Sequence, residues 1–361
     1  MVIFFLGIDY INLRVKNDLF LSRKLIIDSV EIKLFLCFVV LTFVSGLRGG
    51  NVGTDTNSYL NIFLISNGLQ NGHIRIEFLF YALNRIVGIF TDNPQWILLV
   101  SSAIISFNIL SFIKNNSNDV CLSVFLYVCL FYYLASFNVM RQYIAISIIL
   151  YSIKYIKDER FLPFLVSVIV AMGFHRMAIV GIFLWFIFKS NVSIKRVILC
   201  GIILIGGIIS FPLVFTIIKI IWKDLFFYYV NEEIGYAGGW MMPVVYTCIF
   251  IAAFVVVVFD KEWQQNDNNL SLFTCSLISM IWGFSPFVIR GLSATSIQRI
   301  GWLYQIFSIA LIPNLLDSRF FKNKKFLVRS IVVLFGLVHL IYFLSVGEHG
   351  LHNVNPYYIN I

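Results

Sequence analysis

Long, continuous apolar runs separated by short basic linkers constrain this chain more than any other feature. By composition, 60% of the residues are hydrophobic and only 12% are charged, and the mean hydropathy is +0.88. A soluble domain carries about 25% charged residues. Runs of this length suit helices that cross ~30 Å of hydrocarbon, and their lack of alternation excludes a transmembrane barrel. The sequence therefore predicts an all-α polytopic membrane protein.

The apolar runs predict a multi-span bundle of about 11–12 transmembrane helices, forming a single integral-membrane domain over residues 1–361. Met1–Leu13 is apolar but short and is interrupted by Asp9, so a shortened span and an interfacial helix both stay open. Polar segments at 48–75 and 212–240 are predicted loops on the outer face. The predicted spans are Ile32–Leu47, Trp96–Ile113, Cys121–Ala135, Gln142–Ile156, Phe161–Gly173, Met177–Phe188, Val197–Phe211, Met241–Phe259, Leu270–Phe287, Arg299–Leu315 and Phe326–Ser345.

Basic linkers set the expected orientation in the membrane. The linkers Lys154–Arg160 and Lys322–Lys325 belong in the cytoplasm by the positive-inside rule. The net charge of +9 then reflects cytoplasmic loops and anionic lipid, and we expect no nucleic-acid partner. If Ile76–Phe90 crossed the membrane, these linkers would lie outside. That run is also short and carries two charged residues. We therefore predict a re-entrant or interfacial helix near 76–90.

The sequence offers no motif for a metal or a cofactor. All six cysteines lie in apolar runs, and none shows the CxxC spacing of a metal or redox site. The chain also lacks a Walker loop and the HExxH and GxSxG motifs. We expect neither a bound metal nor a cofactor.

A polar stretch between two apolar runs marks the candidate site. Within Phe137–Ala145, the side chains of Asn138, Arg141 and Gln142 share one face of a helix. An arginine at the bilayer centre costs on the order of 2.5–3.5 kcal/mol. Membrane proteins therefore keep such a group at a helix end, against a partner or facing water. A snorkelling interfacial arginine is the alternative explanation.

The expected topology gathers further polar residues on the outer face, where the positive-inside rule predicts few arginines. His175 can accept a proton from a hydroxyl near neutral pH, although a lone histidine at a helix junction is more often structural. Helix capping would be enough to explain Asp55. Because these residues come from separated parts of the chain, they fit a polyanion-binding cavity better than topology signals. The other members of the set are Arg48, Tyr59, Glu77, Arg176, Arg290 and Arg299.

The order of these residues resembles the EpsG family of polysaccharide polymerases, relatives of the Wzy O-antigen polymerases. The resemblance extends from about Phe35 to the Asn355-Pro356-Tyr357 tail. It rests on Leu47-Arg48-Gly49, Val52-Gly53-Thr54-Asp55-Thr56, Tyr59, Glu77, Phe137-Asn138, Arg141-Gln142, Ala145, Phe174-His175 and Arg299.

The resemblance implies a GT-C-like helical bundle in the bacterial cytoplasmic (inner) membrane. The implied activity joins polyprenyl-pyrophosphate-linked oligosaccharide repeat units into exopolysaccharide or O-antigen at the outer face. Membrane lipid and other polysaccharide export proteins are the implied partners.

The residues themselves supply a compatible, metal-independent mechanism. A sugar hydroxyl of one repeat unit attacks the anomeric carbon of another, and polyprenyl pyrophosphate leaves. Arg141 stabilises the leaving group, because a guanidinium contacts two phosphate oxygens at once. His175 ranks first as proton acceptor for its pKa, and Asp55 or Glu77 is the alternative. The residues expected to bind substrate are Arg48, Asp55, Tyr59, Glu77, Asn138, Gln142, Arg176, Arg290 and Arg299.

Two other function classes stay open. A flippase for lipid-linked oligosaccharide also needs a cationic cavity, but it predicts repeat symmetry and broken helices near mid-membrane. The sequence shows no such symmetry, and its polar residues gather on one side. A ligase or another membrane glycan transferase would use the same arginine and histidine chemistry. A non-catalytic assembly protein leaves the outer-face arginines unexplained.

Overall fold

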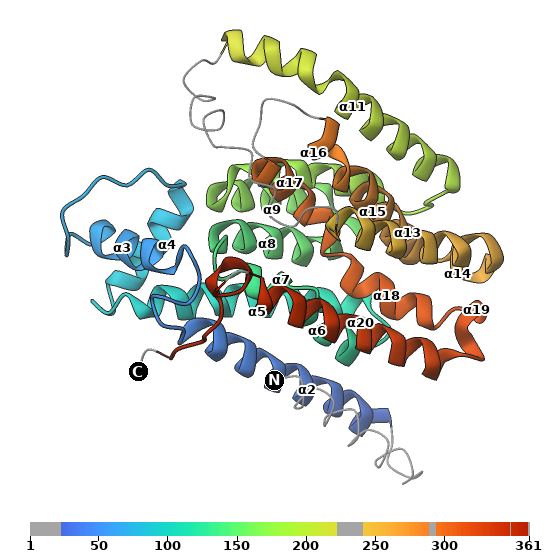
Figure 1. Ribbon diagram of the computed structural model, residues 1–361, viewed down its shortest axis with the longest axis horizontal. Helices are drawn as coiled ribbons and strands as arrows, with labels where there is room; N and C mark the ends of the chain where they lie inside the picture. The colour runs from blue at the N-terminus through green and yellow to red at the C-terminus, as the bar shows by residue number, and fades with distance from the viewer. Residues whose placement is uncertain (1–22, 222–240, 289–293, 347, 360–361) are drawn as a thin grey trace. The chain divides into compact units, whose positions relative to one another are not determined.

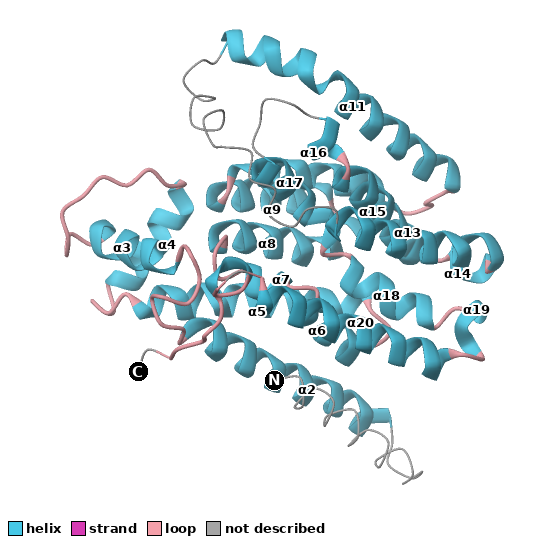
Figure 2. Ribbon diagram, viewed as in Figure 1, coloured by secondary structure: helices cyan, strands magenta, loops and turns pink. Residues whose placement is uncertain are grey.

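The described parts of the chain fold into helices, as the sequence predicts for an all-α protein. Between these helices one isolated antiparallel bridge joins Arg48 to Ile359, and the described segments contain no β-strand (Figures 1 and 2). This computed structural model describes residues 23–221, 241–288, 294–346 and 348–359.

The helices group into two compact units. One comprises the chain up to Ile182 together with Arg329–Ile361, and the other comprises Phe183–Val328. The prediction of one domain over 1–361 remains a prediction.

The first unit is a row of long helices in which α2 packs on α5, α5 on α8 and α8 on α9 (Figure 1). Most side chains of α8 are buried, as expected for a helix with neighbours on several sides. Small polar side chains join the row. The Ser102 hydroxyl donates to Ser45 Oγ at 2.7 Å, and the Asn108 amide donates to Ser147 Oγ at 3.2 Å. The elements are α2 (Arg23–Gly46), α3 (Thr56–Ser66), α4 (Phe78–Gly88), α5 (Gln95–Asn116), α6 (Val120–Cys129), α7 (Tyr132–Ala135), α8 (Met140–Lys157), α9 (Phe161–Phe174), the 3₁₀ helix η1 (Arg176–Phe183), α20 (Lys325–Ser345) and the 3₁₀ helix η2 (Leu351–Asn353).

The second unit is arranged around α15, which contacts α10, α11, α13, α17 and α18. Buried polar groups tie its turns together. Asp260 accepts hydrogen bonds from the backbone amides of Trp263 and Arg319, and the Trp263 indole donates to Asn314 O at 2.9 Å. The elements are α10 (Leu184–Phe188), α11 (Ile194–Ile221), α13 (Met241–Phe259), α14 (Lys261–Gln265), α15 (Asp267–Gly283), α16 (Ser285–Val288), α17 (Ala294–Gln305), α18 (Ser308–Leu316) and α19 (Arg319–Lys322).

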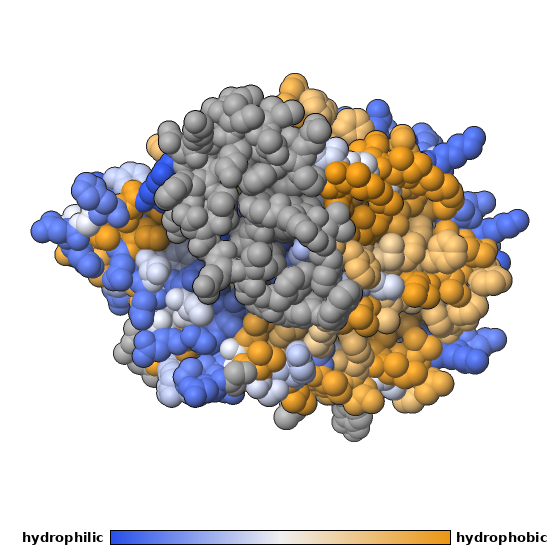
Figure 3. Space-filling model, turned by 45° about the horizontal axis from the view of Figure 1, so that its top comes forward, coloured by the Kyte–Doolittle hydropathy of each residue, from blue (hydrophilic) through white to orange (hydrophobic). Residues whose placement is uncertain are grey.

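Apolar surface is extensive, as a membrane environment requires. Among the described residues, α5 and α20 are long and apolar enough to cross a membrane, by length and composition. Figure 3 shows apolar residues gathered in a broad patch on the visible face. Exposed side chains on α20 recur every three or four residues and form a stripe without polar groups. This stripe consists of Leu327, Ile331, Leu334, Val338 and Ile341.

Four predicted spans are interrupted in the structure. Cys121–Ala135 divides into α6 and α7 at Phe131, whose left-handed backbone (φ 70°) ends the first helix. Met177–Phe188 begins as the 3₁₀ helix η1 and continues as α10. Hydropathy does not register either kind of break, because the side chains remain apolar. The other interrupted spans are Leu270–Phe287, divided into α15 and α16, and Arg299–Leu315, divided into α17 and α18.

The run near 76–90 forms α4, a helix of 11 residues that is about 16 Å long. This is roughly half of the ~30 Å hydrocarbon core, so α4 is too short to cross it. One face of α4, with Phe80 and Val87, is buried, whereas Phe78 and Ile86 are exposed. The interfacial or re-entrant position of α4 remains a prediction.

Parts of three other predictions lie outside the described residues. They concern Met1–Leu13, Arg290 and most of the loop 212–240. At the start of that loop, α11 continues to Ile221, beyond the predicted end of the span at Phe211.

Candidate functional site

The first turn of α8 is held by Tyr59 of α3. This tyrosine is buried, and its hydroxyl donates to Asn138 O at 2.5 Å and accepts from the Met140 amide at 3.1 Å. The Met140 amide belongs to the first turn of α8 and has no partner within the helix. Burial, followed by the negative charge of Asp55, raises the pKa of Tyr59 to about 12. The hydroxyl is therefore protonated at neutral pH and fixes the start of α8.

Arg48 lies beneath the same turn and is completely buried. Its Nε donates to Thr56 Oγ1 at 3.1 Å, and its Nη2 donates to Phe137 O at 3.1 Å and contacts Met140 Sδ at 3.9 Å. Its Nη1 donates to the carbonyl and the hydroxyl of Ser45. Burial lowers the pKa of Arg48 to about 10, so the side chain stays charged at neutral pH.

These contacts direct the donors of the Arg48 guanidinium into the protein. The sequence predicts that Arg48 binds substrate, and that prediction remains untested. The enclosed position suits a residue that fixes the loop after α2 against the start of α8.

Tyr59, Arg48 and Asn138 form a scaffold around the start of α8, and the backbone of the C-terminal tail binds to this scaffold. The Gly53 amide donates to Asn353 O at 2.8 Å, and the side-chain amide of Asn138 donates to His352 O at 3.1 Å. Gly53 has φ +93°, and a Cβ atom there would lie 2.6 Å from Asn138 Oδ1. Only glycine fits this approach without strain.

Arg141 and Glu77 form an ion pair beside this scaffold. The Arg141 Nη1 group donates to Glu77 Oε2, and the two side chains are 29% and 15% exposed. The Nε of Arg141 is buried and has no hydrogen-bond partner within the described ranges. The charges of Arg141 and Asp55 both act on the Tyr59 hydroxyl. Asp55, Glu77 and Arg141 therefore gather around the start of α8, above the buried Arg48.

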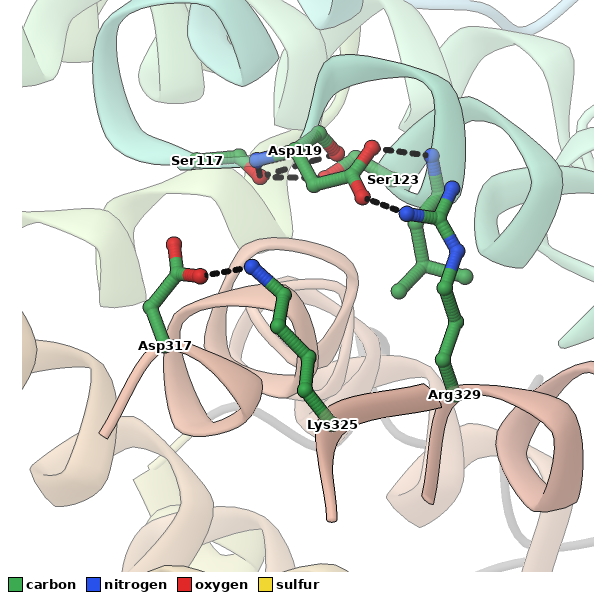
Figure 4. Close-up of polar contacts among 7 residues, drawn as sticks. Ser117, Asp119, Ser123, Asp317, Lys325 and Arg329 are labelled. Atoms are coloured by element: carbon green, nitrogen blue, oxygen red, sulfur yellow. Dashed lines mark hydrogen bonds and ion pairs between the residues drawn. The ribbon is translucent and has the colours of Figure 1, made fainter. Parts of the chain in front are cut away.

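Neither carboxylate caps a helix, although both stand at N-cap positions. Asp55 precedes α3 and Glu77 precedes α4, and neither side chain accepts a cap hydrogen bond. N-cap carboxylates elsewhere do so: Asp119 accepts from the Leu122 amide at 3.0 Å, and Asp260 caps α14. Figure 4 shows Asp119 in this role. Capping therefore does not explain Asp55.

His175 lies at the same end of the first unit as the ion pair. α8 and α9 form an antiparallel hairpin, so the last turn of α9 is level with the beginning of α8. Near that turn, a Cβ atom at Gly173 would lie 2.5 Å from the Leu79 side chain of α4. The end of α9 therefore packs closely on α4 at Leu79, which lies two residues after Glu77 in the sequence.

The remaining predicted residues are more dispersed. Gln142 is buried in α8, and Arg176 is exposed on η1. Arg299 is exposed on α17 in the second unit, and Arg290 lies outside the described residues. The described contacts bring together, in the first unit, Arg48, Asp55, Tyr59, Glu77, Asn138 and Arg141.

Sequence reasoning missed the groups that support this cluster. Ser45 and Met140 hold Arg48 together with Thr56, which the sequence marks only as part of the family resemblance, and the tail contributes the carbonyl groups of His352 and Asn353. A backbone carbonyl carries no residue-specific signal. Within the described ranges, no group of three or more His, Cys, Asp or Glu side chains is placed to hold a metal ion.

The family resemblance implies polymerisation, and Tyr59→Phe should lower the rate of that reaction by about 5- to 30-fold while the protein still folds. The change removes the hydroxyl that bonds to Asn138 O and to the Met140 amide. Each lost hydrogen bond is worth about 1 kcal/mol, and the start of α8 loses its fixed position. Initial rates with purified protein measure the effect, and Tyr81→Phe on the exposed side of α4 is the control. Equal rates for the two variants would contradict a positioning role.

The described residues form an α-helical fold that includes two helices long and apolar enough to cross a membrane, with a partly exposed charge cluster beside the start of a buried helix. The chain belongs to the EpsG family, whose family model matches residues 31–359, and the resemblance in the sequence is thereby confirmed. The members are Wzy-like polysaccharide polymerases, so this chain is a membrane protein of the polysaccharide polymerase type. Comparisons with curated proteins and with solved structures found no match.

Proposed function

We propose that the protein joins polyprenyl-pyrophosphate-linked oligosaccharide repeat units into exopolysaccharide or O-antigen. The reaction takes place at the outer face of the bacterial cytoplasmic membrane, in a multi-pass, GT-C-like helical bundle. Family membership supports the activity class. The observation that carries the proposal is the partly exposed Arg141–Glu77 pair on a scaffold that fixes the start of α8.

Arg141 is the residue we propose for the donor pyrophosphate. It stands in the first turn of the 18-residue helix α8, where the backbone dipoles also favour an anion. Its planar guanidinium contacts two phosphate oxygens at once. Negative charge develops on the leaving pyrophosphate as the bond to the anomeric carbon breaks, and the arginine stabilises that charge without a metal.

The surrounding residues have supporting roles in this proposal. Tyr59 and Asn138 position the first turn of α8, and Arg48 fixes the loop beneath it. The proton acceptor is one of the three groups that the sequence indicates, which are His175, Asp55 and Glu77. Substrate contacts are also proposed for Gln142, Arg176, Arg290 and Arg299.

Labelling of single cysteines with an impermeant maleimide tests the orientation. In a background without the six natural cysteines, Asn57→Cys should react in intact cells and Asp158→Cys only after lysis. Both positions are exposed, so burial does not limit either reaction. The basic linker Lys154–Arg160 motivates the cytoplasmic assignment. Labelling of residue 158 but not residue 57 in intact cells would overturn the map.

Deletion of the gene followed by sizing of the glycan tests the function. A polymerase deletion should leave single repeat units at the outer surface. A flippase deletion would leave no repeat units there, and a ligase deletion would leave long polymer on the polyprenyl carrier. Either of these two results would reject the proposed function.

A further inference from the structure

Building on the proposed function, we propose that Glu77 is the proton acceptor of the polymerase reaction. In the structure its carboxylate pairs with Arg141, the group that receives the donor pyrophosphate in the proposed function. Donor binding displaces Glu77 from Arg141 and frees it for the sugar hydroxyl that attacks. Donor binding and activation of the acceptor are thereby coupled in one exchange of partners.

The ion pair is weak enough to be exchanged. Its side chains are 29% and 15% exposed, so water reaches both charges and screens part of their attraction. A pyrophosphate carries more charge than a carboxylate and offers oxygens from two phosphates. The buried Nε of Arg141, which has no partner in the described part of the chain, gives the anion a further donor.

In the described part of the chain, the ion pair with Arg141 is the contact that the structure shows for the Glu77 side chain. Its side chain does not cap α4, and its backbone is extended (φ −68°, ψ 145°) ahead of the first helical turn. Asp55 differs, because its carboxylate accepts a hydrogen bond from the neighbouring Thr54 hydroxyl at 3.1 Å rather than from an arginine. Of the two carboxylates, Glu77 is therefore the one that donor binding releases.

The position of Glu77 places it near the reacting atoms. The anomeric carbon of the donor is separated from phosphorus by one oxygen, so a group that touches the phosphate-binding arginine lies close to that carbon. A general base must come within about 2.6–3.2 Å of the proton donor, or reach it through one water. The contact with Arg141 places the Glu77 carboxylate at the phosphate-binding group, and this geometry supports Glu77 as the acceptor.

The acceptor oxygen forms a bond to the anomeric carbon, and its proton passes to the Glu77 carboxylate. The bond between the anomeric carbon and the phosphate oxygen breaks, and its electron pair leaves with the polyprenyl pyrophosphate. The Glu77 carboxylic acid then loses its proton to water and pairs again with Arg141 when the carrier departs.

Glu77→Gln gives a signature that a structural role would not produce. Removal of the competing carboxylate should tighten the binding of polyprenyl pyrophosphate by about 1.5- to 5-fold. Loss of the general base should lower the single-turnover rate by about 10²-fold. Glu77→Asp keeps the chemistry and should recover part of the rate. The matched control is Glu262→Gln, because Glu262 also pairs with an arginine, Arg319, but in the second unit.

Binding and rate are measured on the full-length protein in lipid nanodiscs. Tighter binding with a normal rate would show that Glu77 only occupies Arg141, and loss of both would show a structural role; either result overturns the inference. If His175→Ala lost about 10²-fold in rate while Glu77→Gln kept the wild-type rate, the base would be His175. Failure of the polymerase proposal can be told apart from failure of this inference, because in that case the wild-type protein itself would form no polymer.

Discussion

Arg141→Lys should lower the rate of polymerisation by about 10²–10³-fold, although the positive charge is kept. Lysine replaces a planar group that meets two phosphate oxygens with a compact ammonium. Loss of one hydrogen bond that acts on the transition state costs on the order of 3–4 kcal/mol. Because the Arg141 side chain is partly exposed, the level of protein in the membrane should remain near normal. Initial rates and immunoblots of the membrane fraction measure the two quantities.

The matched control is Arg319→Lys, which alters an exposed arginine that pairs with Glu262. This variant should polymerise at the wild-type rate. Both assays are repeated with a chelator, and the metal-independent mechanism predicts that the wild-type rate persists. Full activity of Arg141→Lys, or loss of wild-type activity on chelation, is incompatible with the proposed chemistry.

Arg48→Met should destabilise the first unit instead of acting on chemistry alone. The buried guanidinium supplies donors to Ser45, Thr56 and Phe137, and methionine supplies none. Buried acceptors left without a donor cost about 1–3 kcal/mol each, so we expect a loss on the order of 3 kcal/mol. Arg48→Lys should recover only part of it, because an ammonium has three donors where the guanidinium has five.

Thermal unfolding in detergent measures this effect. The midpoint should fall for Arg48→Met and, less strongly, for Arg48→Lys, whereas Arg141→Lys should unfold at the wild-type temperature. Wild-type unfolding of Arg48→Met would contradict the structural role that we assign to this residue. Reduced activity of a normally stable Arg48→Lys protein would return Arg48 to the substrate-binding set.

The apolar runs predict much of the secondary structure, but they predict the candidate site only in part. Hydropathy located α5, α8, α9 and α20, because long apolar segments in a membrane protein fold as helices. It did not locate the left-handed Phe131 that separates α6 from α7, since that break changes the backbone and not the polarity.

The polar cluster was predicted as a set, but the roles within it were not. Arg48 and Arg141 look alike in sequence, at the ends of apolar runs, yet one is enclosed by the protein and the other is partly exposed. Part of the difference arises from Phe137 O, which binds Arg48 but lies far from it in sequence, whereas Ser45 and Thr56 are near neighbours along the chain. The Arg141–Glu77 pair is likewise a long-range contact that neither residue's local sequence indicates.

Product sizing with purified components tests the central claim most directly. The full-length protein in lipid nanodiscs is supplied with lipid-linked repeat units from its host as the only glycan, and the products are separated by length. The account predicts a ladder of polymers that retain the polyprenyl pyrophosphate carrier at one end, with free polyprenyl pyrophosphate released in proportion to the bonds formed. Repeat units that remain single under these conditions would contradict it.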